Sequence, residues 1–327
     1  GGLRGPPALF HERCPMAAVS HFKTFSTHPA CRIILDSTSA VTDELAERMG
    51  VDVVEFPFVM ADGQHWDDQY KSIGVKEFYD RMRAGERVLT SAVPTGEFVE
   101  IFRACAEDGV PTMYLSLTGG LSSSVSDARQ AASLLKDERP DFDLAVIDSC
   151  APSLTATLLC QAACKLRDEG KTMREIVEWV EANKHRIHGY SSLESLDWLV
   201  AGGRVPKAAA SISAVLDMKA DLTYDLDGSL TLTGVSRGRK KALKGLVKKL
   251  KELYRGDAEH MIGIVDADDA EAADAVEEMV RAELGDACPS IQRFTLDPTI
   301  GGHVGPGMVA LAFWGTDRAQ DARASKR

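Results

Sequence analysis

Residues 32–60 read RIILDSTSAVTDELAERMGVDVVEFPFVM, and this stretch decides the fold class of the chain. The apolar run RIILD predicts a buried strand, TDELAERM predicts a helix that Thr42 caps, and VDVVEFPFVM predicts a second strand. A strand, a helix and a strand in this order are typical of a parallel sheet that helices cover.

The same alternation continues through the first half of the chain. The next elements that we expect are helices near 75–84 and 96–107, the strand TMYLSL, a helix from about Ser122 to Lys136, the strand LAVID, and helices over about 151–169 and 172–184. The sequence therefore predicts a parallel α/β/α domain over residues 31–188.

The pattern changes after residue 188. Alternating residues on both sides of Asp227-Gly228 predict a β-hairpin, because aspartate followed by glycine favours a tight turn. A helix is expected between Gly203 and this hairpin. The elements expected after it are helices at about 238–254 and 269–284 and the strands MIGIVD, IQRFTL and MVALAFW. Residues 189–316 are therefore expected to form a second α/β domain with a mixed sheet.

The two ends of the chain carry weaker patterns. Residues 1–30 lack the continuous apolar core of a signal peptide, and we expect them to be a disordered extension. Residues 317–327 are expected to form a short tail.

Composition excludes several classes of protein. The 327 residues suffice for two cores, and the net charge of -11 argues against nucleic acid as a partner. Seven scattered cysteines do not form a disulfide framework and indicate a reducing, cytoplasmic location. Cys160 and Cys164 share a helix face but have no second pair, so they predict apolar packing and no metal site. No apolar run approaches the roughly 20 residues that span a bilayer.

The segment YLSLTGGLSSSVSDARQAASLL, residues 114–135, carries the clearest chemical signal. A strand ends, two glycines turn the chain, and serines begin a helix. Free backbone N–H groups and the helix dipole converge at such a place, and a serine hydroxyl can donate to a carboxylate or phosphate. Ser122 is therefore either an anion ligand or only the N-cap of the helix.

Two further segments are weak by themselves. LTSAVPTGEF places Thr90 and Ser91 at another strand-to-helix junction, where hydroxyls usually cap the helix. DPTIGGHVGPGMVALAFW reads as a glycine-rich loop that carries His303 before an apolar strand. His303 either donates to a ligand or is a loop residue with its own partner.

Taken in order, these segments resemble the DegV family of fatty-acid-binding proteins, which includes the FakB subunits of fatty-acid kinases. The resemblance covers residues 32–316. The motifs that carry it are IILDSTS, Thr90 to Pro94, Leu121-Ser122, Asp148-Ser149, LDWLVAGGR, DGSLTLTGVSRGRKKAL and GGHVGPG.

The resemblance implies a site and a ligand. It implies that Thr90, Ser91, Ser122 and His303 hold a fatty-acid carboxylate, with Ser123 and Gly302 beside them. The acyl chain, of the palmitate, stearate or oleate class, would lie in an apolar tunnel between the domains. Thr155 and Thr157 stand about where the family has glycines, which bears on the chain length accepted. The protein itself would be no enzyme and would need no cofactor.

The resemblance also implies a partner, a FakA-like kinase that phosphorylates the bound acid. Residues 237–251 contain eight basic residues and no acidic one, in a chain of net charge -11. Such a run is either a solvated helix face or a docking surface whose charge steers the partner. The residues expected to dock are Arg204, Arg237, Arg239, Lys240 and Lys241.

Two other functions stay open on the sequence. One is an enzyme, a hydrolase that uses Ser122 with His303 or a phosphotransferase. The chain has no G-x-S-x-G elbow and no phosphate-binding G-x-x-x-x-G-K-[ST] loop, which argues against this function. The other is a regulatory module in which a lipid only stabilises the fold.

Overall fold

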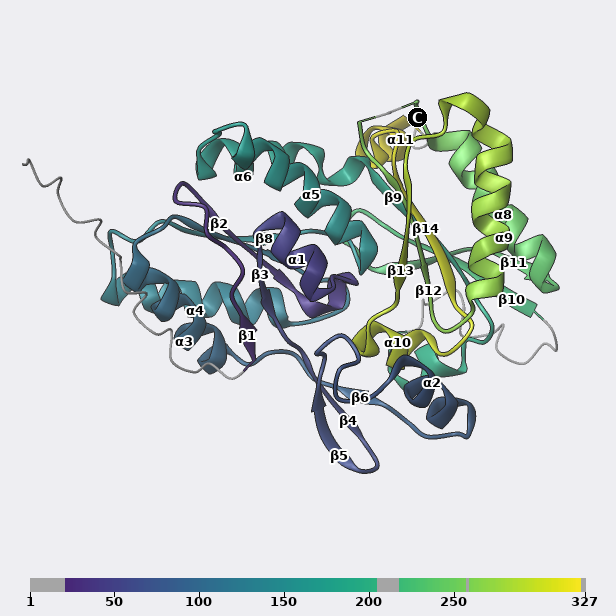
Figure 1. Cartoon of the computed structure of the whole chain (residues 1–327), viewed down its shortest axis with the longest axis horizontal. Coiled ribbons are helices and arrows are strands. Elements are labelled where there is room, and N and C mark those ends of the chain that lie inside the picture. The colour runs from purple at the N-terminus through teal and green to yellow at the C-terminus, as the bar shows by residue number, and fades with distance from the viewer. Residues whose placement is uncertain (1–20, 205–217, 257–258, 325–327) are drawn as a thin grey trace, which may run out of the picture.

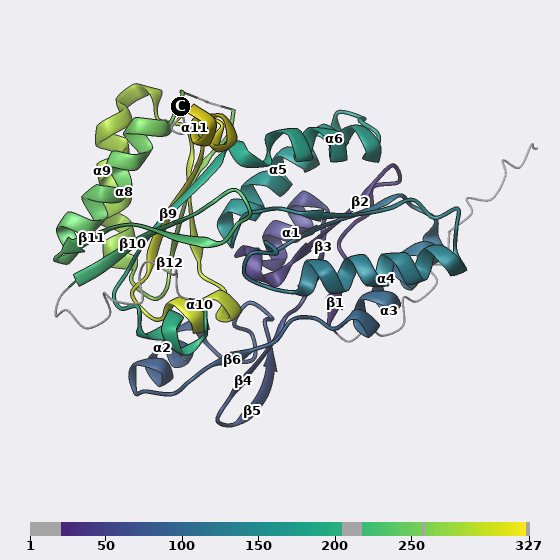
Figure 2. The ribbon, with the colours of Figure 1, turned by 180° about the vertical axis from the view of Figure 1, so that it is seen from behind.

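The computed structural model describes residues 21–204, 218–256 and 259–324. Two large sheets stand side by side; helix α6 lies over the N-terminal sheet, and helix α5 lies between the two sheets (Figures 1 and 2). The expected α/β class is confirmed. The helix expected between Gly203 and the hairpin lies outside the described residues.

The N-terminal sheet is almost entirely parallel. Its strands, in spatial order, are β1 (Phe22–Lys23), β3 (Asp52–Val54), β2 (Arg32–Asp36), β7 (Thr112–Ser116) and β8 (Leu144–Asp148). Only the edge strand β1 pairs antiparallel. The helices of this half are α1 (Asp43–Met49), α3 (Thr95–Asp108), α4 (Ser124–Glu138), α5 (Leu154–Asp168) and α6 (Met173–Asn183).

The order of these strands locates a ligand site. The chain moves outward from β2 to β3 on one side and from β7 to β8 on the other. In open α/β sheets, ligands bind where this direction reverses, beyond the carboxyl ends of the strands. Here that point lies beyond Asp36 of β2 and Ser116 of β7.

The C-terminal sheet is mixed, as expected. Its strands, in spatial order, are β11 (Leu230–Arg237), β10 (Met218–Tyr224), β9 (Ile187–Leu193), β14 (Val309–Trp314), β12 (Ile262–Asp266) and β13 (Ile291–Thr295). Only β12 and β13 are parallel. The helices of this half are α7 (Asp197–Ala201), α8 (Arg239–Leu253), α9 (Ala270–Leu284), α10 (Pro298–Val304) and α11 (Arg318–Ala324).

A third, small sheet corrects one prediction. VDVVEFPFVM is not one strand: β3 stays in the N-terminal sheet, and β4 (Pro57–Met60) pairs with β5 (Gly63–Trp66) and β6 (Leu89–Thr90). Pro57 has no N–H for a ladder and marks the break. The segment 57–90, which includes α2 (Val75–Arg83), lies against α10 of the C-terminal half (Figure 1).

The domain limits also differ from the expected ones in detail. Within the expected N-terminal extension, residues 21–30 are ordered: β1 pairs with β3, and Asp52 accepts from the N–H groups of Phe25 and Ser26, both at 2.7 Å. Residues 1–20 lie outside the described chain. The expected boundary at residue 188 falls inside β9, and most of the expected C-terminal tail forms α11.

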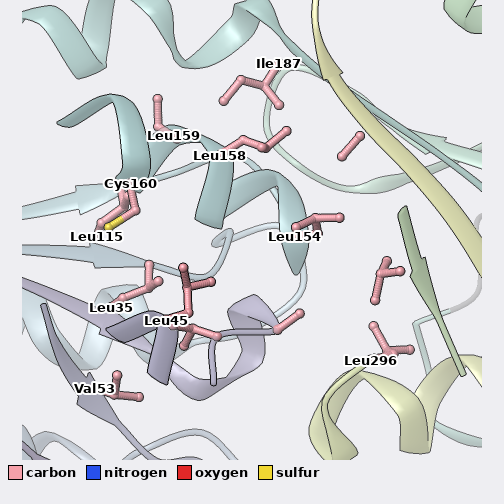
Figure 3. Close-up of a cluster of buried hydrophobic side chains, with 14 of the residues drawn as sticks. Leu35, Leu45, Val53, Leu115, Leu154, Leu158, Leu159, Cys160, Ile187 and Leu296 are labelled. Carbon is pink, nitrogen blue, oxygen red and sulfur yellow. The ribbon is translucent and has the colours of Figure 1, made fainter. Parts of the chain in front are cut away.

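Helix α5 joins the cores of the two halves. Figure 3 shows Leu158 and Leu159 of α5 among side chains from both halves, with Leu35 and Leu115 on one side and Ile187 on the other. All five are at most 2 % exposed. Cys160 and Cys164 of the same helix are buried, as the sequence predicted.

Candidate functional site

One cavity lies between the two large sheets, at the point where the strand order of the N-terminal sheet reverses. It contains about 1120 Å³ of empty space, part of it open to solvent. Much of its wall is apolar, with Phe56 and Leu117 from the N-terminal half, Leu154 from α5, and Leu222 and Ala310 from the C-terminal sheet.

The structure brings most of the expected ligand residues together at this cavity. Thr90 and Ser91 come from β6 and its end, Ser122 and Ser123 from the turn before α4, and His303 from α10. The five residues come from three segments that are far apart in the sequence. Hydroxyl groups and an imidazole therefore share the wall of one cavity.

The turn between β7 and α4 is held by residues of both halves. Gly119 donates its N–H to Asp148, and Thr118 Oγ1 donates to the carbonyl of Asp227 at 3.1 Å. A Cβ on Gly120 would stand 2.5 Å from Ser229 N, so only glycine lets the hairpin turn approach. The hairpin at Asp227-Gly228 thereby positions the serine turn.

Ser122 lies on the cavity wall and also helps to begin α4. Its Oγ accepts from the N–H of Ser124 at 3.2 Å and contacts Ser124 Oγ at 3.1 Å. The helix starts at Ser124, two residues later than expected. The N-cap position falls on Ser123, whose side chain makes no cap hydrogen bond, so the N-cap expected at Ser122 is corrected.

His303 stands in a short helix and not in a loop, which corrects the prediction. Asp297 caps α10 by accepting from Ile300 N, and Pro298 occupies the first turn. His303 Nε2 lies 2.7 Å from Thr90 Oγ1. Burial, with the nearby charge of Arg204, lowers the pKa of His303 to about 4, so the imidazole is neutral near pH 7.

Two glycines make room for this helix. A Cβ on Gly202 would stand 2.2 Å from His303 Nδ1, so glycine at this position accommodates the ring. A Cβ on Gly302 would stand 2.8 Å from Val88, and Gly302 does not line the cavity. Gly302, expected beside the ligand, therefore serves the packing of α10 against the segment 57–90.

Arg204 lies at the edge of the cavity. Its guanidinium donates to the carbonyls of Gly202, at 2.7 Å, and Leu121, at 3.4 Å. It also lines the cavity. This cation therefore stands beside the serine turn as well as on the exposed surface.

The other end of the cavity reaches β9 and β10, where Thr155 of α5 meets the sheet. A Cβ on Gly189 would stand 2.8 Å from Thr155 Cγ2 and 2.9 Å from Tyr224 Cε1. Thr155 and Tyr224 therefore pack closely against Gly189 of β9, and all three residues line the cavity. Sequence reasoning identified Thr155 but missed Gly189 and Tyr224.

The contacts of Ser122 and His303 do not form a hydrolase pair. His303 Nε2 is engaged with Thr90, and Nδ1 is buried with no partner in the described chain. Ser122 pairs with Ser124. A general base must reach the hydroxyl that it activates, and among the described residues no carboxylate bonds to this histidine.

The basic run lies on β11 and α8, where its members differ. Arg239 is paired with Glu194, at 3.3 Å, and with Asp269, at 2.5 Å, and it donates to the carbonyl of Gly307. Four other basic residues are exposed and form no ion pair with any described residue: Arg237, Lys240, Lys241 and Lys244. Arg239 therefore belongs to the fold, whereas these four side chains are exposed without an ion pair in the described chain.

None of the helices in the described residues has the length and apolar character that crossing a membrane requires. The described part of the chain also contains no group of three or more histidine, cysteine or acidic side chains placed to hold a metal ion.

The fold and the cavity define a class: two-sheet α/β proteins with a ligand cavity between the sheets. The family model described as "Uncharacterised protein, DegV family" matches residues 30–315, and the chain belongs to this family. A DegV domain-containing protein of Clostridium perfringens is 29% identical over 283 residues, 86% of this chain and 97% of the relative. Another, of Caldanaerobacter subterraneus, is 30% identical over 284 residues, 86% of this chain and 97% of the relative.

Solved structures share the fold. A DegV family protein from Thermus thermophilus, described with fatty-acid binding, has a TM-score of 0.78 and 24% identity, and the match covers 88% of this chain and 100% of that one. A DegV family protein from Eubacterium eligens, loaded with heptadecanoic acid, has a TM-score of 0.76 and 21% identity, with coverage of 88% and 100%. A stearic-acid-binding protein from Eubacterium ventriosum has a TM-score of 0.76 and 22% identity, with coverage of 88% and 99%.

Proposed function

We propose that this protein binds a long-chain fatty acid by its carboxylate and presents it to a partner kinase in the cytoplasm. The observation that carries the proposal is the cavity, in which hydroxyls and one imidazole stand together on a wall that is otherwise largely apolar. Relatives of the same fold have been solved with heptadecanoic acid and described as binding stearic acid.

The polar residues suit a carboxylate. We assign the proton of the neutral imidazole to Nε2, from which it is donated to Thr90 Oγ1, because the buried Nδ1 has no partner in the part of the chain that the structure describes. The Thr90 hydroxyl can then give its own proton to the ligand. Ser91, Ser122 and Ser123 offer further hydroxyls, and Arg204 adds a positive charge.

The apolar wall suits an acyl chain. Removing one methylene from water contributes about 0.8 kcal/mol, so a long chain supplies most of the affinity. The hydroxyls then chiefly fix which end of the ligand faces the cavity mouth. This division fits a carrier, which must hold its ligand in one orientation and still release it.

Native mass spectrometry of the protein purified from bacteria tests the binding. We expect one fatty acid per chain, released by denaturation and organic extraction, which reports its length and unsaturation. A protein that carries no fatty acid and takes up neither added oleate nor palmitate would contradict the proposal. The hydrolase alternative predicts instead that the pure protein cleaves acyl esters and that Ser122→Ala abolishes the cleavage.

The exposed cations of α8 and β11 support the second part of the proposal. A FakA-like kinase with an acidic docking face would be steered by Arg237, Lys240 and Lys241. We expect the triple charge reversal of these residues to Glu to lower acyl-phosphate formation by such a kinase at least about tenfold, while fatty acid stays bound. Lys248→Glu, on the same helix, is the control and should change turnover little. Undiminished turnover in the triple variant would show that the kinase does not dock on this surface.

A further inference from the structure

Three buried carboxyl groups stand behind the wall of the cavity. Asp36 ends β2, Asp67 follows β5, and Asp297 precedes α10, and each is 0 % exposed. None of the three has an ion pair with a cation in the described part of the chain. A buried carboxylate without a counter-charge is strongly unfavourable, so such groups tend to keep a proton.

Asp67 and Asp297 both lie at the start of α10. One oxygen of Asp297 accepts from Ile300 N at 2.8 Å; the other is buried, and it has no hydrogen-bond partner in the described chain. Asp67 accepts from Thr299 Oγ1 at 2.8 Å, so its carboxyl stands beside the same turn of the helix. Two neighbouring buried carboxyls with no cation are stable only if one of them carries a proton.

The surroundings of the pair offer no compensating charge. Asp36 faces it from β2, Gln69 donates to Asp67, and the hydroxyls of Tyr70 and Tyr79 are directed to the carbonyl of Leu296. Near Tyr79, Asp266 ends β12 and Asp268 follows it, and each has its own arginine, Arg293 and Arg83 respectively. The elements packed around the pair therefore present acids or neutral groups to it.

Burial sets the direction of the titration. It raises the pKa of Asp36 to about 6 and that of Asp297 to about 7. Burial, with the charge of Asp297, raises the pKa of Asp67 well above its usual range. His303 has a pKa of about 4 and does not change its charge above pH 6.

Each of the three acids holds a part of the cavity wall. Asp67 binds Thr299, which lines the cavity, and Asp297 caps the helix that ends with His303 and Val304. Asp36 accepts from Leu117 N at 2.6 Å, and Leu117 also lines the cavity. The acids are thus positioning residues that act through α10 and the strand end.

We propose that the proton shared by Asp67 and Asp297 is a latch that holds α10 against the segment 57–90 and makes retention of the ligand depend on pH. The inference rests on the proposed function, since α10 carries His303 to the carboxylate. When the proton leaves, two like charges face each other in a buried place, and α10 separates from Asp67. Release of the ligand then accelerates.

Loss of the shared proton must also lower the free energy of unfolding of the ligand-free protein. The folded-state pKa values lie above those of the unfolded chain, so the contribution of the pair is complete below about pH 4 and is lost as pH rises through about 7. This second readout does not require any fatty acid. It therefore separates failure of the latch from failure of the proposed function.

The test uses cis-parinaric acid, a fluorescent long-chain fatty acid, and the variant Asp297→Asn. Asparagine caps a helix as well as aspartate does and never loses a proton. We expect release from the wild type to become about tenfold faster between pH 6 and 9, the change that one pKa unit produces, and release from the variant to stay constant. The control Asp221→Asn removes another half-buried acid, hydrogen-bonded to Ser236 on the outer strands, and should keep the wild-type profile.

A wild type whose release and unfolding are both independent of pH overturns the latch, as does an Asp297→Asn variant that keeps the wild-type profile. If that variant does not fold, Asp67→Asn makes the same comparison, since its amide can donate to Asp297. If cis-parinaric acid binds at no pH, the proposed function fails. The pH dependence of unfolding of the ligand-free wild type and variant then tests the latch by itself.

Discussion

The two ends of the cavity are built in different ways. The polar end is assembled from three short segments, β6, the serine turn and α10, each held by a few hydrogen bonds. The end near Tyr224 is the face of a continuous sheet, β10, β9 and β14, closed by α5. A few hydrogen bonds set orientation, whereas apolar area contributes in proportion to the length of chain buried. Orientation and affinity should therefore be separable by experiment.

The largest effect is expected from the ligand chain itself. Replacing stearate by laurate removes six methylenes at about 0.8 kcal/mol each, so Kd should rise by about three orders of magnitude. Isothermal titration calorimetry measures both affinities. Equal affinities would mean that the acyl chain lies outside the cavity and that its apolar end does not supply the affinity.

A smaller effect is expected from His303→Ala at the polar end. Loss of one or two hydrogen bonds at about 1 kcal/mol each should weaken stearate binding about tenfold. The variant should unfold at nearly the wild-type temperature. Thr90→Val is the companion variant, because it removes the same hydrogen bond from the other side. Unchanged affinity in both variants would place the carboxylate elsewhere.

Gly202→Ala should reproduce the effect of His303→Ala while residue 303 stays a histidine. The new Cβ would stand 2.2 Å from Nδ1, so the ring must move. The double variant should bind no more weakly than either single variant, because both remove one interaction. Gly234→Ala, whose Cβ meets nothing closer than 3.8 Å, is the control. Additive losses would show that Gly202 acts through something other than His303.

The smallest effect is expected where α5 meets β9. Thr155→Ala removes a methyl and a hydroxyl beside Gly189 and Tyr224. Competition between stearate and palmitate should shift toward stearate by about fivefold, within what two methylenes contribute. A shift toward the shorter chain would mean that the acyl chain ends before it reaches Thr155.

The elements of the fold also differ in whether a local sequence pattern predicts them. Strands such as RIILD and LAVID are continuous apolar runs and could be predicted locally. The break at Pro57 was hidden in one apolar run, and the two glycines of α10 disfavour a helix. The pair Asp297-Pro298 was the available signal for that helix, since it combines an N-cap with proline in the first turn.

The cavity wall was predictable where its residues lie in short motifs. Hydroxyls at the ends of strands indicated Thr90, Ser91 and Ser122, and the glycine-rich segment before the last strand indicated His303; the family resemblance implied that they act together. Contacts between distant segments left no local pattern. Arg239 looks like its basic neighbours in the sequence, yet Glu194 and Asp269 engage it in the fold. Asp67 and Asp297 are neighbours in the fold but lie more than two hundred residues apart in the sequence, and no local pattern near either residue predicts that they meet.

The packing of the segment 57–90 against α10 has a consequence for folding during synthesis. The ribosome makes this segment long before α10, which begins at Pro298. Segments made early usually fold as units during synthesis. Here Tyr79 and Val88 must wait for Gly301 and Gly302, against which they pack. The nascent first half therefore emerges with an uncovered apolar surface, a natural client for chaperones until the last part of the chain arrives.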